Sequence, residues 1–273
     1  MSASVPAVHA VFFSPTGSTG KVCLAAATAI AAAKSLPFYE HDLTPPSARA
    51  SLEPFGPEDI VVAASPTYAG KLPNKILPDL ERLLVGHGTR ALAVTTFGNR
   101  SPDNSLAELA SLMNKNGFLL AGAASVVCRH AFSDALAGGR PDERDLDELA
   151  DWAVMAIDHA SALTLEEIPG DAAAPYYVPK GIDGQPAKFL KAKPVTDHAL
   201  CDGCGLCAAA CPVGSIDAAQ NFEALGLCIK CQACVRLCPK GAKHFEDPAF
   251  LSHVAMLEAN FAGRNENRYY PAR

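Results

Sequence analysis

The cysteines are the residues of this chain whose spacing most directly predicts chemistry. Of the 10 cysteines, most fall within residues 201–238. Two runs there, Cys201–Pro212 and Cys228–Pro239, both read C-x2-C-x2-C-x3-C-P. The first three cysteines of such a run ligate one [4Fe–4S] cluster, and the fourth ligates the cluster of the other run. The pattern therefore predicts two clusters, one held by Cys201, Cys204, Cys207 and Cys238 and the other by Cys228, Cys231, Cys234 and Cys211.

Other uses of clustered cysteines fit this pattern less well. Structural zinc favours two C-x2-C pairs separated by a longer loop, and a secreted disulfide framework spreads its cysteines along the chain. Zinc stays as the alternative to iron–sulfur chemistry. The other two cysteines, Cys23 and Cys128, lie in apolar segments, so we expect both thiols in the hydrophobic core.

The segment from about residue 196 to 245 resembles the bacterial two-cluster ferredoxins, because both cysteine runs match that family's spacing without insertions. The resemblance implies a small α+β fold, two low-potential [4Fe–4S] clusters and redox proteins as partners. In charge the segment departs from that family, since its four acidic residues are balanced by Lys230, Arg236, Lys240 and Lys243, where free ferredoxins are usually acidic. Positive charge near a cluster stabilises its reduced form and raises its potential.

A turn rich in hydroxyls and glycine opens the first predicted helix. Residues 14–21 read Ser-Pro-Thr-Gly-Ser-Thr-Gly-Lys. Hydroxyls beside the free N–H groups of a helix N-terminus favour a bound phosphate. The turn is not a P-loop, which would need glycine at Pro15 and a hydroxyl at Val22, and it does not match G-x-G-x-x-G. The alternative is an ordinary capped helix start without a ligand.

Two further turns favour a ligand at the same place. Ser65–Gly70 follows the third predicted strand and Thr96–Arg100 follows the fourth. Turns at the carboxyl ends of parallel strands meet at one edge of the sheet, where open α/β sheets bind their ligands. Tyr68 and Phe97 would supply aromatic walls for a flat ring, and the neighbouring glycines would leave backbone groups accessible to its edge. A phosphate site beside aromatic walls predicts FMN.

The first part of the chain, about residues 5–160, resembles the flavodoxins. Their T-x-T-G-x-T phosphate loop appears as Ser14-x-Thr16-Gly17-x-Thr19, and their P-T-Y loop as Pro66-Thr67-Tyr68. The resemblance implies a phosphate held by Ser14, Thr16, Gly17, Ser18 and Thr19. It implies that one flavin face and N5 meet Pro66, Thr67, Tyr68, Ala69 and Gly70, and that the pyrimidine edge meets Phe97, Gly98 and Asn99. Asn99 stands where short-chain flavodoxins often have an aromatic residue, so the second flavin face would be covered by Phe97 or left open.

Alternating patterns in the first 160 residues predict the sheet that positions these turns. Apolar, β-rich runs of the kind found in strands buried on both faces lie at 8–13, 36–39, 60–64, 91–96 and 119–127. Helical patterns lie between them, with Asn74 and Asp142 as candidate caps and Ser105 with Glu108 as a candidate capping box. Only residues 44–57 lack a helix pattern. We expect an α/β fold: a flavodoxin-like, doubly wound, five-stranded parallel sheet followed by a bacterial-ferredoxin-like α+β domain.

Prolines mark the boundaries of the remaining segments. The prolines between residues 169 and 194 predict an extended linker, whose lysines 180, 188, 191 and 193 would face the acidic first domain. Asp247 as cap, Pro248 in the first turn and Gly263 as stop predict a C-terminal helix that packs on the rest. The expected domains are 1–164, flavodoxin-like and FMN-binding; 165–195, a proline-rich linker; 196–246, a two-cluster ferredoxin domain; and 247–273, a C-terminal helix and tail.

This order of segments resembles the flavodoxin–ferredoxin fusion proteins of anaerobes. The resemblance implies an electron-transfer protein that relays electrons between FMN and two [4Fe–4S] clusters. His130 and Arg140 lie in a stretch similar to one that this family carries after its fifth strand. For Arg140 a solvated loop is the favoured interpretation, whereas His130 would either approach the flavin or the linker or lie in that loop. Two alternatives stay open: a flavin-dependent reductase of a small substrate with His130 as its acid, and a non-redox binding module with structural clusters or zinc.

Composition excludes several other classes of protein. The formal net charge is −6, and neither half has the basic stripe of a nucleic-acid-binding protein. The longest uncharged apolar run, residues 22–33, is too short to span a bilayer, and no basic residue precedes Lys21 as in a secretory signal peptide. We therefore expect a cytoplasmic protein. No nicotinamide site, nucleophile with its base or pair of catalytic carboxylates is apparent, so the sequence does not specify a substrate, and it does not indicate an oligomeric state.

Overall fold

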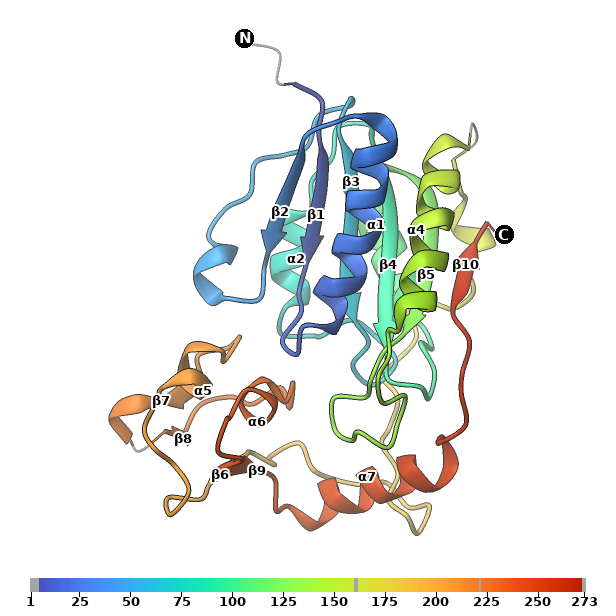
Figure 1. Cartoon of the computed structure of the whole chain (residues 1–273). Helices are drawn as coiled ribbons and strands as arrows, with labels where there is room; N and C mark the ends of the chain where they lie inside the picture. Colours follow the sequence, from blue (N-terminus) through green and yellow to red (C-terminus); the bar gives the residue numbers. More distant parts are fainter. Residues whose placement is uncertain (1–4, 160–161, 221, 272–273) are drawn as a thin grey trace.

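A computed structural model of the chain describes residues 5–159, 162–220 and 222–271. Its largest element is a sheet with strand order β10-β5-β4-β3-β1-β2. The strands are β1 (Val8–Phe12), β2 (Phe38–Asp42), β3 (Ile60–Pro66), β4 (Thr89–Phe97), β5 (Phe118–Val127) and β10 (Arg268–Tyr270). Strands β1 to β5 are parallel, and their order, 2-1-3-4-5, is the flavodoxin-like doubly wound order. The predicted fold class is therefore confirmed (Figure 1).

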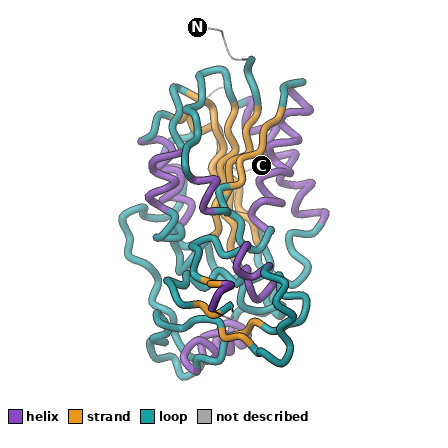
Figure 2. The backbone as a smooth tube through the Cα atoms, turned by 90° about the vertical axis from the view of Figure 1, so that its left-hand side faces the viewer, coloured by secondary structure: helices purple, strands orange, loops and turns teal. Residues whose placement is uncertain are grey.

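Two helical layers cover the sheet, one on each face (Figure 2). Helices α1 (Ser18–Lys34) and α4 (Glu143–Asp158) bury one face, and α2 (Leu77–Leu83) and α3 (Ser105–Lys115) bury the other. Because side chains alternate along a strand, the neighbours Phe12 and Phe13 enter opposite cores. The strand sequences are therefore continuous apolar runs. The helices packed on both faces hold the turns at the carboxyl ends of the strands in fixed positions.

Several predicted element boundaries are wrong. The second strand runs from Phe38 to Asp42 instead of 36–39, and a 3₁₀ turn, η1 (Pro46–Arg49), lies in the stretch without a helix pattern. Asn74 does not cap α2, whose N-cap is Ile76. At α3 the N-cap is Asn104, and the Glu108 carboxylate accepts a hydrogen bond from the Leu72 N–H instead of closing a capping box. The Glu108 and Asn104 side chains accept hydrogen bonds from the backbone of other segments instead, at Leu72 and Asp171.

Two caps agree with the prediction. Asp142 and Asp145 form a reciprocal capping box at the start of α4, in which each side chain accepts a hydrogen bond from the other residue's backbone N–H. The Asp247 carboxylate accepts a hydrogen bond from the Phe250 N–H at the start of α7 (Pro248–Asn260). Helix α7 ends at Asn260, before the predicted stop at Gly263.

The sheet has a sixth strand that the sequence does not predict. After α7 the chain returns to the first domain, and β10 pairs antiparallel with β5. Tyr269 of β10 packs against the indole of Trp152, with ring centroids 5.3 Å apart, and the Trp152 Nε1–H donates to the Pro271 carbonyl. The C-terminal tail therefore covers the β5 edge of the sheet.

The cysteine-bearing segment folds as a small α+β module at the carboxyl ends of the strands (Figure 1). It contains two antiparallel strand pairs and two short helices: β6 (Val195–Thr196) with β9 (Lys243–His244), β7 (Ile216–Asp217) with β8 (Glu223–Ala224), α5 (Leu206–Ala209) and α6 (Ala233–Arg236). The 3₁₀ turn η3 (Ala218–Gln220) lies between β7 and β8. Each cysteine run thus has one short helix and one strand pair to position it.

The linker packs against both parts of the molecule. After the 3₁₀ turn η2 (Leu165–Glu167), the buried Lys71 ammonium donates to the carbonyls of Ala172 and Ala174. Further on, the Tyr177 N–H donates to the Ala69 carbonyl. The Lys193 ammonium donates to Leu225 in the cysteine module, so this lysine does not contact the first domain as expected.

Candidate functional site

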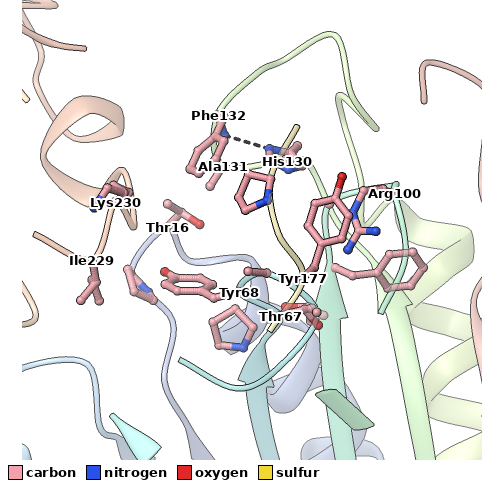
Figure 3. A pocket seen from close by; sticks show the side chains of 18 of the residues that line it. Thr16, Thr67, Tyr68, Arg100, His130, Ala131, Phe132, Tyr177, Ile229 and Lys230 are labelled. Atoms are coloured by element: carbon pink, nitrogen blue, oxygen red, sulfur yellow. Dashed lines mark hydrogen bonds between the residues drawn. The ribbon is translucent and has the colours of Figure 1, made fainter. Parts of the chain in front are cut away.

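A cavity of about 630 Å³ lies at the carboxyl ends of β1, β3 and β4, which is a volume typical of small-molecule sites. The strand order reverses between β1 and β3, and such switch points are where open α/β sheets bind ligands. The turns after these strands form one side of the cavity, and the loop after β5, the linker, α7 and the second cysteine run form the rest. Figure 3 shows some of the side chains that line it.

The structure brings most of the predicted FMN-binding residues together around this cavity. Those that line it are Thr16, Ser18, Thr19, Pro66, Thr67, Tyr68, Ala69, Gly70, Phe97 and Gly98. Ser14, Gly17 and Asn99 do not line it. Cys128, buried as predicted, also reaches the cavity wall.

The first turn has the geometry of an anion cradle. Gly17 precedes α1 with a φ of 85°, a conformation that glycine adopts without strain. The Ser14 hydroxyl accepts a hydrogen bond from the Gly20 N–H at 2.8 Å, so Ser14 shapes the turn from behind. Among the described residues the N–H groups of Ser18 and Thr19 have no protein acceptor, as expected for the start of a helix. These two N–H groups fit a phosphate.

Thr19 has a structural partner as well as a place in the cradle. Its hydroxyl lies 2.7 Å from the Thr96 hydroxyl, and this contact joins α1 to the end of β4. Thr16 also lines the cavity, and within the described part of the chain its hydroxyl has no protein partner. Thr16 is therefore the threonine of this turn whose side chain is free to meet a ligand.

The Pro66–Gly70 turn is held in shape by contacts on its outer side. The Thr67 hydroxyl lies 2.6 Å from the Ser105 hydroxyl, and Gly70, with a φ of 80°, leaves no room for a Cβ beside the Asp103 carboxylate. Tyr68 lies between this turn and the cysteine module (Figure 3). Desolvation raises the pKa of its hydroxyl well above 10, and the nearby Cys231 and Cys228 raise it further, so Tyr68 stays protonated.

Asn99 has a different role from the predicted one. Its side-chain amide donates to the carbonyls of Phe261 and Gly263, the latter at 2.8 Å, and its oxygen accepts from the Asn265 N–H. The side chain is buried in these contacts with the C-terminal tail. Asn99 therefore fastens the tail beneath the fourth strand instead of facing the cavity.

The linker supplies a wall that sequence reasoning missed. Tyr177 lies over the cavity, and the Arg100 guanidinium stacks on its ring at 4.1 Å from the centroid. The Tyr176 hydroxyl donates to the Leu72 carbonyl at 2.8 Å. The sequence feature that could have indicated this wall is the pair of adjacent tyrosines in the proline-rich linker. Tyr177 and Tyr68 thus approach the cavity from different sides (Figure 3).

His130 lines the cavity in the loop after β5. Its ring packs against Gly98, where any Cβ would collide with it, and Nδ1 accepts a hydrogen bond from the Phe132 N–H at 3.1 Å. Burial lowers the pKa of His130 to about 4, and His253, Arg100 and Arg236 add to that shift. His130 is therefore a neutral imidazole, and its Nε2 carries the proton.

Arg140 is buried, which contradicts the expectation of a solvated loop. Its guanidinium pairs with the buried Asp145 carboxylate and also donates to the Asn265 carbonyl at 2.6 Å. Asn267 donates to the same carboxylate at 3.0 Å. The pair therefore joins the start of α4 to the C-terminal tail.

The eight cysteines of the two runs fall into two sets around two small pockets. One pocket is lined by Cys201, Cys204, Cys207 and Cys238, and the other by Cys211, Cys228, Cys231 and Cys234. Each set takes its fourth cysteine from the other run, as the motif predicts. Among the described residues, no three histidine, cysteine or acidic side chains converge on a single-ion site. Four thiols around a shared pocket fit a polynuclear cluster better than one zinc ion.

Backbone N–H groups point at several of these sulfur atoms. Ser215 N–H donates to Cys211 Sγ at 3.1 Å, and Ala242 N–H donates to Cys238 Sγ at 3.2 Å. Such bonds stabilise thiolate ligands and tune a cluster's potential. Burial raises the pKa of the free Cys231 and Cys234 thiols to about 12, so a metal bound beside them would be needed to hold them as thiolates.

The two cysteine pockets differ in their surroundings. Cys228 lines both its own pocket and the large cavity, so the second set lies next to the candidate flavin site. The first set lies farther along the module, where Cys204 is exposed. The molecule thus has, one after another in space, the cavity, the adjoining pocket of the second cysteine set and the outer pocket of the first set.

Comparison with known proteins supports the description of the cysteine module. Residues 193–239 match the family model for a 4Fe-4S dicluster domain. No curated protein matches the chain significantly. The chain therefore joins a flavodoxin-like sheet, assigned from its strand order, to a segment of the 4Fe-4S dicluster type.

Three solved flavodoxin structures align with just over half of the chain. A flavodoxin from the domain Archaea aligns at 15% identity and a TM-score of 0.37, over 55% of this chain and 99% of its own. The Streptococcus pneumonia TIGR4 flavodoxin aligns at 20% identity and 0.39, over 54% and 97%. A short-chain flavodoxin associated with a non-canonical PDU bacterial microcompartment aligns at 17% identity and 0.40, over 57% and 99%.

Within the described residues, no helix is both long enough and apolar enough to cross a bilayer.

Proposed function

We propose that this chain is an electron-transfer flavo-iron–sulfur protein, with FMN in the large cavity and one [4Fe–4S] cluster in each cysteine pocket. The observation that carries the proposal is the position of Cys228, which belongs to the second cysteine set and also lines the cavity. A cluster ligated there would adjoin the flavin. We further propose that the protein works in the cytoplasm of an anaerobe and exchanges electrons with other redox proteins.

FMN couples two-electron and one-electron reactions, because it accepts electrons in pairs and releases them singly, whereas each cluster carries one. The chain's own residues would set the conditions for that exchange. Ser18 and Thr19 would bind the phosphate through their N–H groups, Tyr68 would cover the ring, and Tyr177 and the linker would exclude water.

Few residues separate the second cysteine pocket from the cavity along the chain. Ile229 and Lys230 follow Cys228 and also line the cavity beside Tyr68 (Figure 3). The Lys230 ammonium is held by the carbonyls of Leu190, at 2.7 Å, and Cys228, at 3.2 Å. A positive charge at this point would favour the reduced states on both sides of the junction.

The stoichiometry of the cofactors tests the proposal first. Protein purified without oxygen should hold about eight irons, an equal amount of sulfide and one FMN, as two clusters and one flavin require. Chemical analysis of iron, sulfide and flavin on one sample measures this. Protein that takes up two zinc ions and no sulfide during iron–sulfur reconstitution would contradict the proposal.

The second test is kinetic. In anaerobic stopped flow, a low-potential donor should reduce clusters and flavin with an internal exchange whose rate does not depend on protein concentration, because donor and acceptor belong to one molecule. A rate of flavin reduction that rises with protein concentration would show that the two sites meet only between molecules, and the relay would be wrong.

A further inference from the structure

The cavity extends beyond the turns that fit FMN. Its remaining walls come from the loop after β5, the linker and α7, elements that are not part of a flavodoxin-like sheet edge. We call this region the aromatic compartment, and its side chains are His130, Phe132, Pro179, Phe189, His253 and Leu257. In Figure 3, His130 and Phe132 lie on the side of the cavity away from Thr67 and the sheet edge.

The rings of the compartment hold one another in place. Phe132 lies between the two imidazoles, with its centroid 5.0 Å from that of His130 and 6.4 Å from that of His253. Phe189 stacks on His253 with centroids 5.3 Å apart. Phe189, His253 and Leu257 are all buried. The walls are therefore apolar and pre-formed, as in sites that bind flat aromatic ligands.

The two histidines offer opposite hydrogen-bonding groups. At His130, Nδ1 accepts from the Phe132 N–H, so a neutral ring carries its proton on Nε2 and can donate there. At His253, Nδ1 lies 2.8 Å from the Lys180 carbonyl and must donate to it, so Nε2 of a neutral ring is an acceptor. Burial lowers the pKa of both rings and keeps them neutral.

No partner for either Nε2 is present among the described residues, although both rings line the cavity. The aromatic walls fit a flat, uncharged ligand, and an oxygen on it could accept from His130. In a reduced, hydroxyl form it could also donate to His253. A quinone and its hydroquinone meet these requirements, because one accepts at its oxygens and the other both accepts and donates.

We propose that the aromatic compartment binds a small aromatic quinone, with His130 donating to its oxygen and His253 accepting from the hydroxyl of the hydroquinone. Binding does not depend on the flavin. Reduction rests on the proposed function and balances as FMNH₂ + quinone → FMN + hydroquinone. Two electrons and two protons leave the flavin, and both carbonyl oxygens become hydroxyls.

Two probes separate the roles of the histidines. Calorimetric titration of the oxidised, FMN-loaded protein with 1,4-naphthoquinone, which only accepts hydrogen bonds, should give binding that His130→Leu weakens about five- to tenfold. His130→Gln, which keeps an N–H donor, should restore most of it. His253→Leu should weaken 1-naphthol by a similar factor and change naphthoquinone affinity less than about twofold.

The control is His244→Leu, whose ring is exposed on β9 and should change neither affinity. FMN content should stay equal in all variants. Two results would overturn the compartment: naphthoquinone that displaces FMN, or probe affinities that stay the same when either histidine is replaced. A quinone that binds but is left unreduced by the photoreduced holoprotein would overturn the reductase activity alone. Protein that takes up no FMN but binds both probes would support the compartment and overturn the proposed function instead.

Discussion

The buried pair of Arg140 and Asp145 shows how one ionic contact can join distant parts of a chain. Burial alone would raise the pKa of Asp145, but hydrogen bonds from Arg140, the Asp142 N–H and Asn267 outweigh it and lower that pKa to about 2. The carboxylate is therefore charged at neutral pH and holds both Arg140 and the C-terminal tail. Breaking such a pair leaves an uncompensated buried charge, which costs far more than the pair itself contributes.

We expect Asp145→Asn to lower the free energy of unfolding by about 3 kcal/mol at pH 7, and Arg140→Met with Asp145→Leu to cost less. The folded pKa lies below the ordinary value of 3.8. The stabilisation is thus complete above that value and is lost as pH falls toward 2. Urea unfolding of wild type and Asp145→Asn at several pH values measures this. A difference between them that does not shrink in acid would contradict it.

At the phosphate cradle, the structure separates two threonines that the sequence treats alike. Thr16→Ala should weaken FMN several-fold and leave riboflavin, which lacks the phosphate, almost unchanged. Thr19→Ala should weaken both, because it also removes the contact with Thr96. Fluorescence titration of the two ligands compares them, with the exposed Thr28→Ala in the same helix as control. Equal losses of both ligands in Thr16→Ala would mean that Thr16 only maintains the fold.

At the scale of elements, the C-terminal strand β10 protects an otherwise open sheet edge. It covers β5, an apolar strand whose backbone would be free to pair with another chain. It also encloses Trp152, the only tryptophan of the protein, beneath Tyr269 and the Pro271 carbonyl. The tail is therefore part of the first domain's structure.

Removing residues 264–273 should shift the fluorescence of Trp152 to longer wavelength, because water would reach the indole. It should also speed hydrogen exchange along β5 and promote association, since the strand edge becomes free. Emission spectra and exchange mass spectrometry measure both effects. Replacing only Arg268 by Lys, which keeps the backbone pairing, is the matched control. An unchanged emission maximum after truncation would show that β10 does not shield the indole.

Elements with strong local patterns could be predicted from the sequence, and those made by distant contacts could not. Each of the predicted strands and the main helices is present, because apolar period and helix propensity are properties of neighbouring residues. The three residues of β10 carry no such pattern, and their pairing comes from β5, far away in sequence. The same reason explains Glu108 and Asn99, whose polar side chains pair with other elements instead of with a nearby cap or a ligand.

The candidate site divides in the same way. The phosphate turn, the Tyr68 turn and the cysteine runs carry spacing that their chemistry requires, so the sequence indicates them. Tyr177 and His253 belong to no motif of fixed spacing, because they reach the cavity only through the path of the linker and of α7. The walls that the linker and α7 contribute to the cavity form only when the chain is folded, so the sequence does not indicate them.

For the whole molecule, docking of the cysteine module rests on buried contacts more than on net charge. Arg236 of α6 donates to the carbonyls of Ala131, at 3.0 Å, and His130, at 3.2 Å, and pairs with Asp134. Arg49 donates to the Pro212 carbonyl at 2.6 Å. Bonds to carbonyls in partly buried positions are weakly screened by salt, unlike attraction between the linker lysines and the acidic first domain, which the sequence suggested.

Arg236→Ala should therefore slow the internal exchange between clusters and flavin several-fold, because it loosens the module on the loop after β5. Added salt should change the wild-type rate little. Stopped flow at low and at about 0.5 M ionic strength measures both, with Arg144→Ala, an exposed arginine of α4, as control. A wild-type rate that falls steeply with salt would show that long-range charge, and not these contacts, holds the module in place.

The path of the chain makes the cysteine module an insertion and not an appendage. The chain leaves the sheet domain after α4, forms the linker and the module, and returns as β10 (Figure 1). Residues 1–164 alone would lack an edge strand and one side of their cavity. The linker enters the module from the sheet domain, and α7 with the tail leads back to it. Shortening either connection would change the walls of the cavity and also the distance from the cavity to the cysteine pockets. The sheet domain therefore depends on chain that lies on both sides of the module: β10, which follows it, completes the sheet, and the linker and α7, which flank it, complete the cavity.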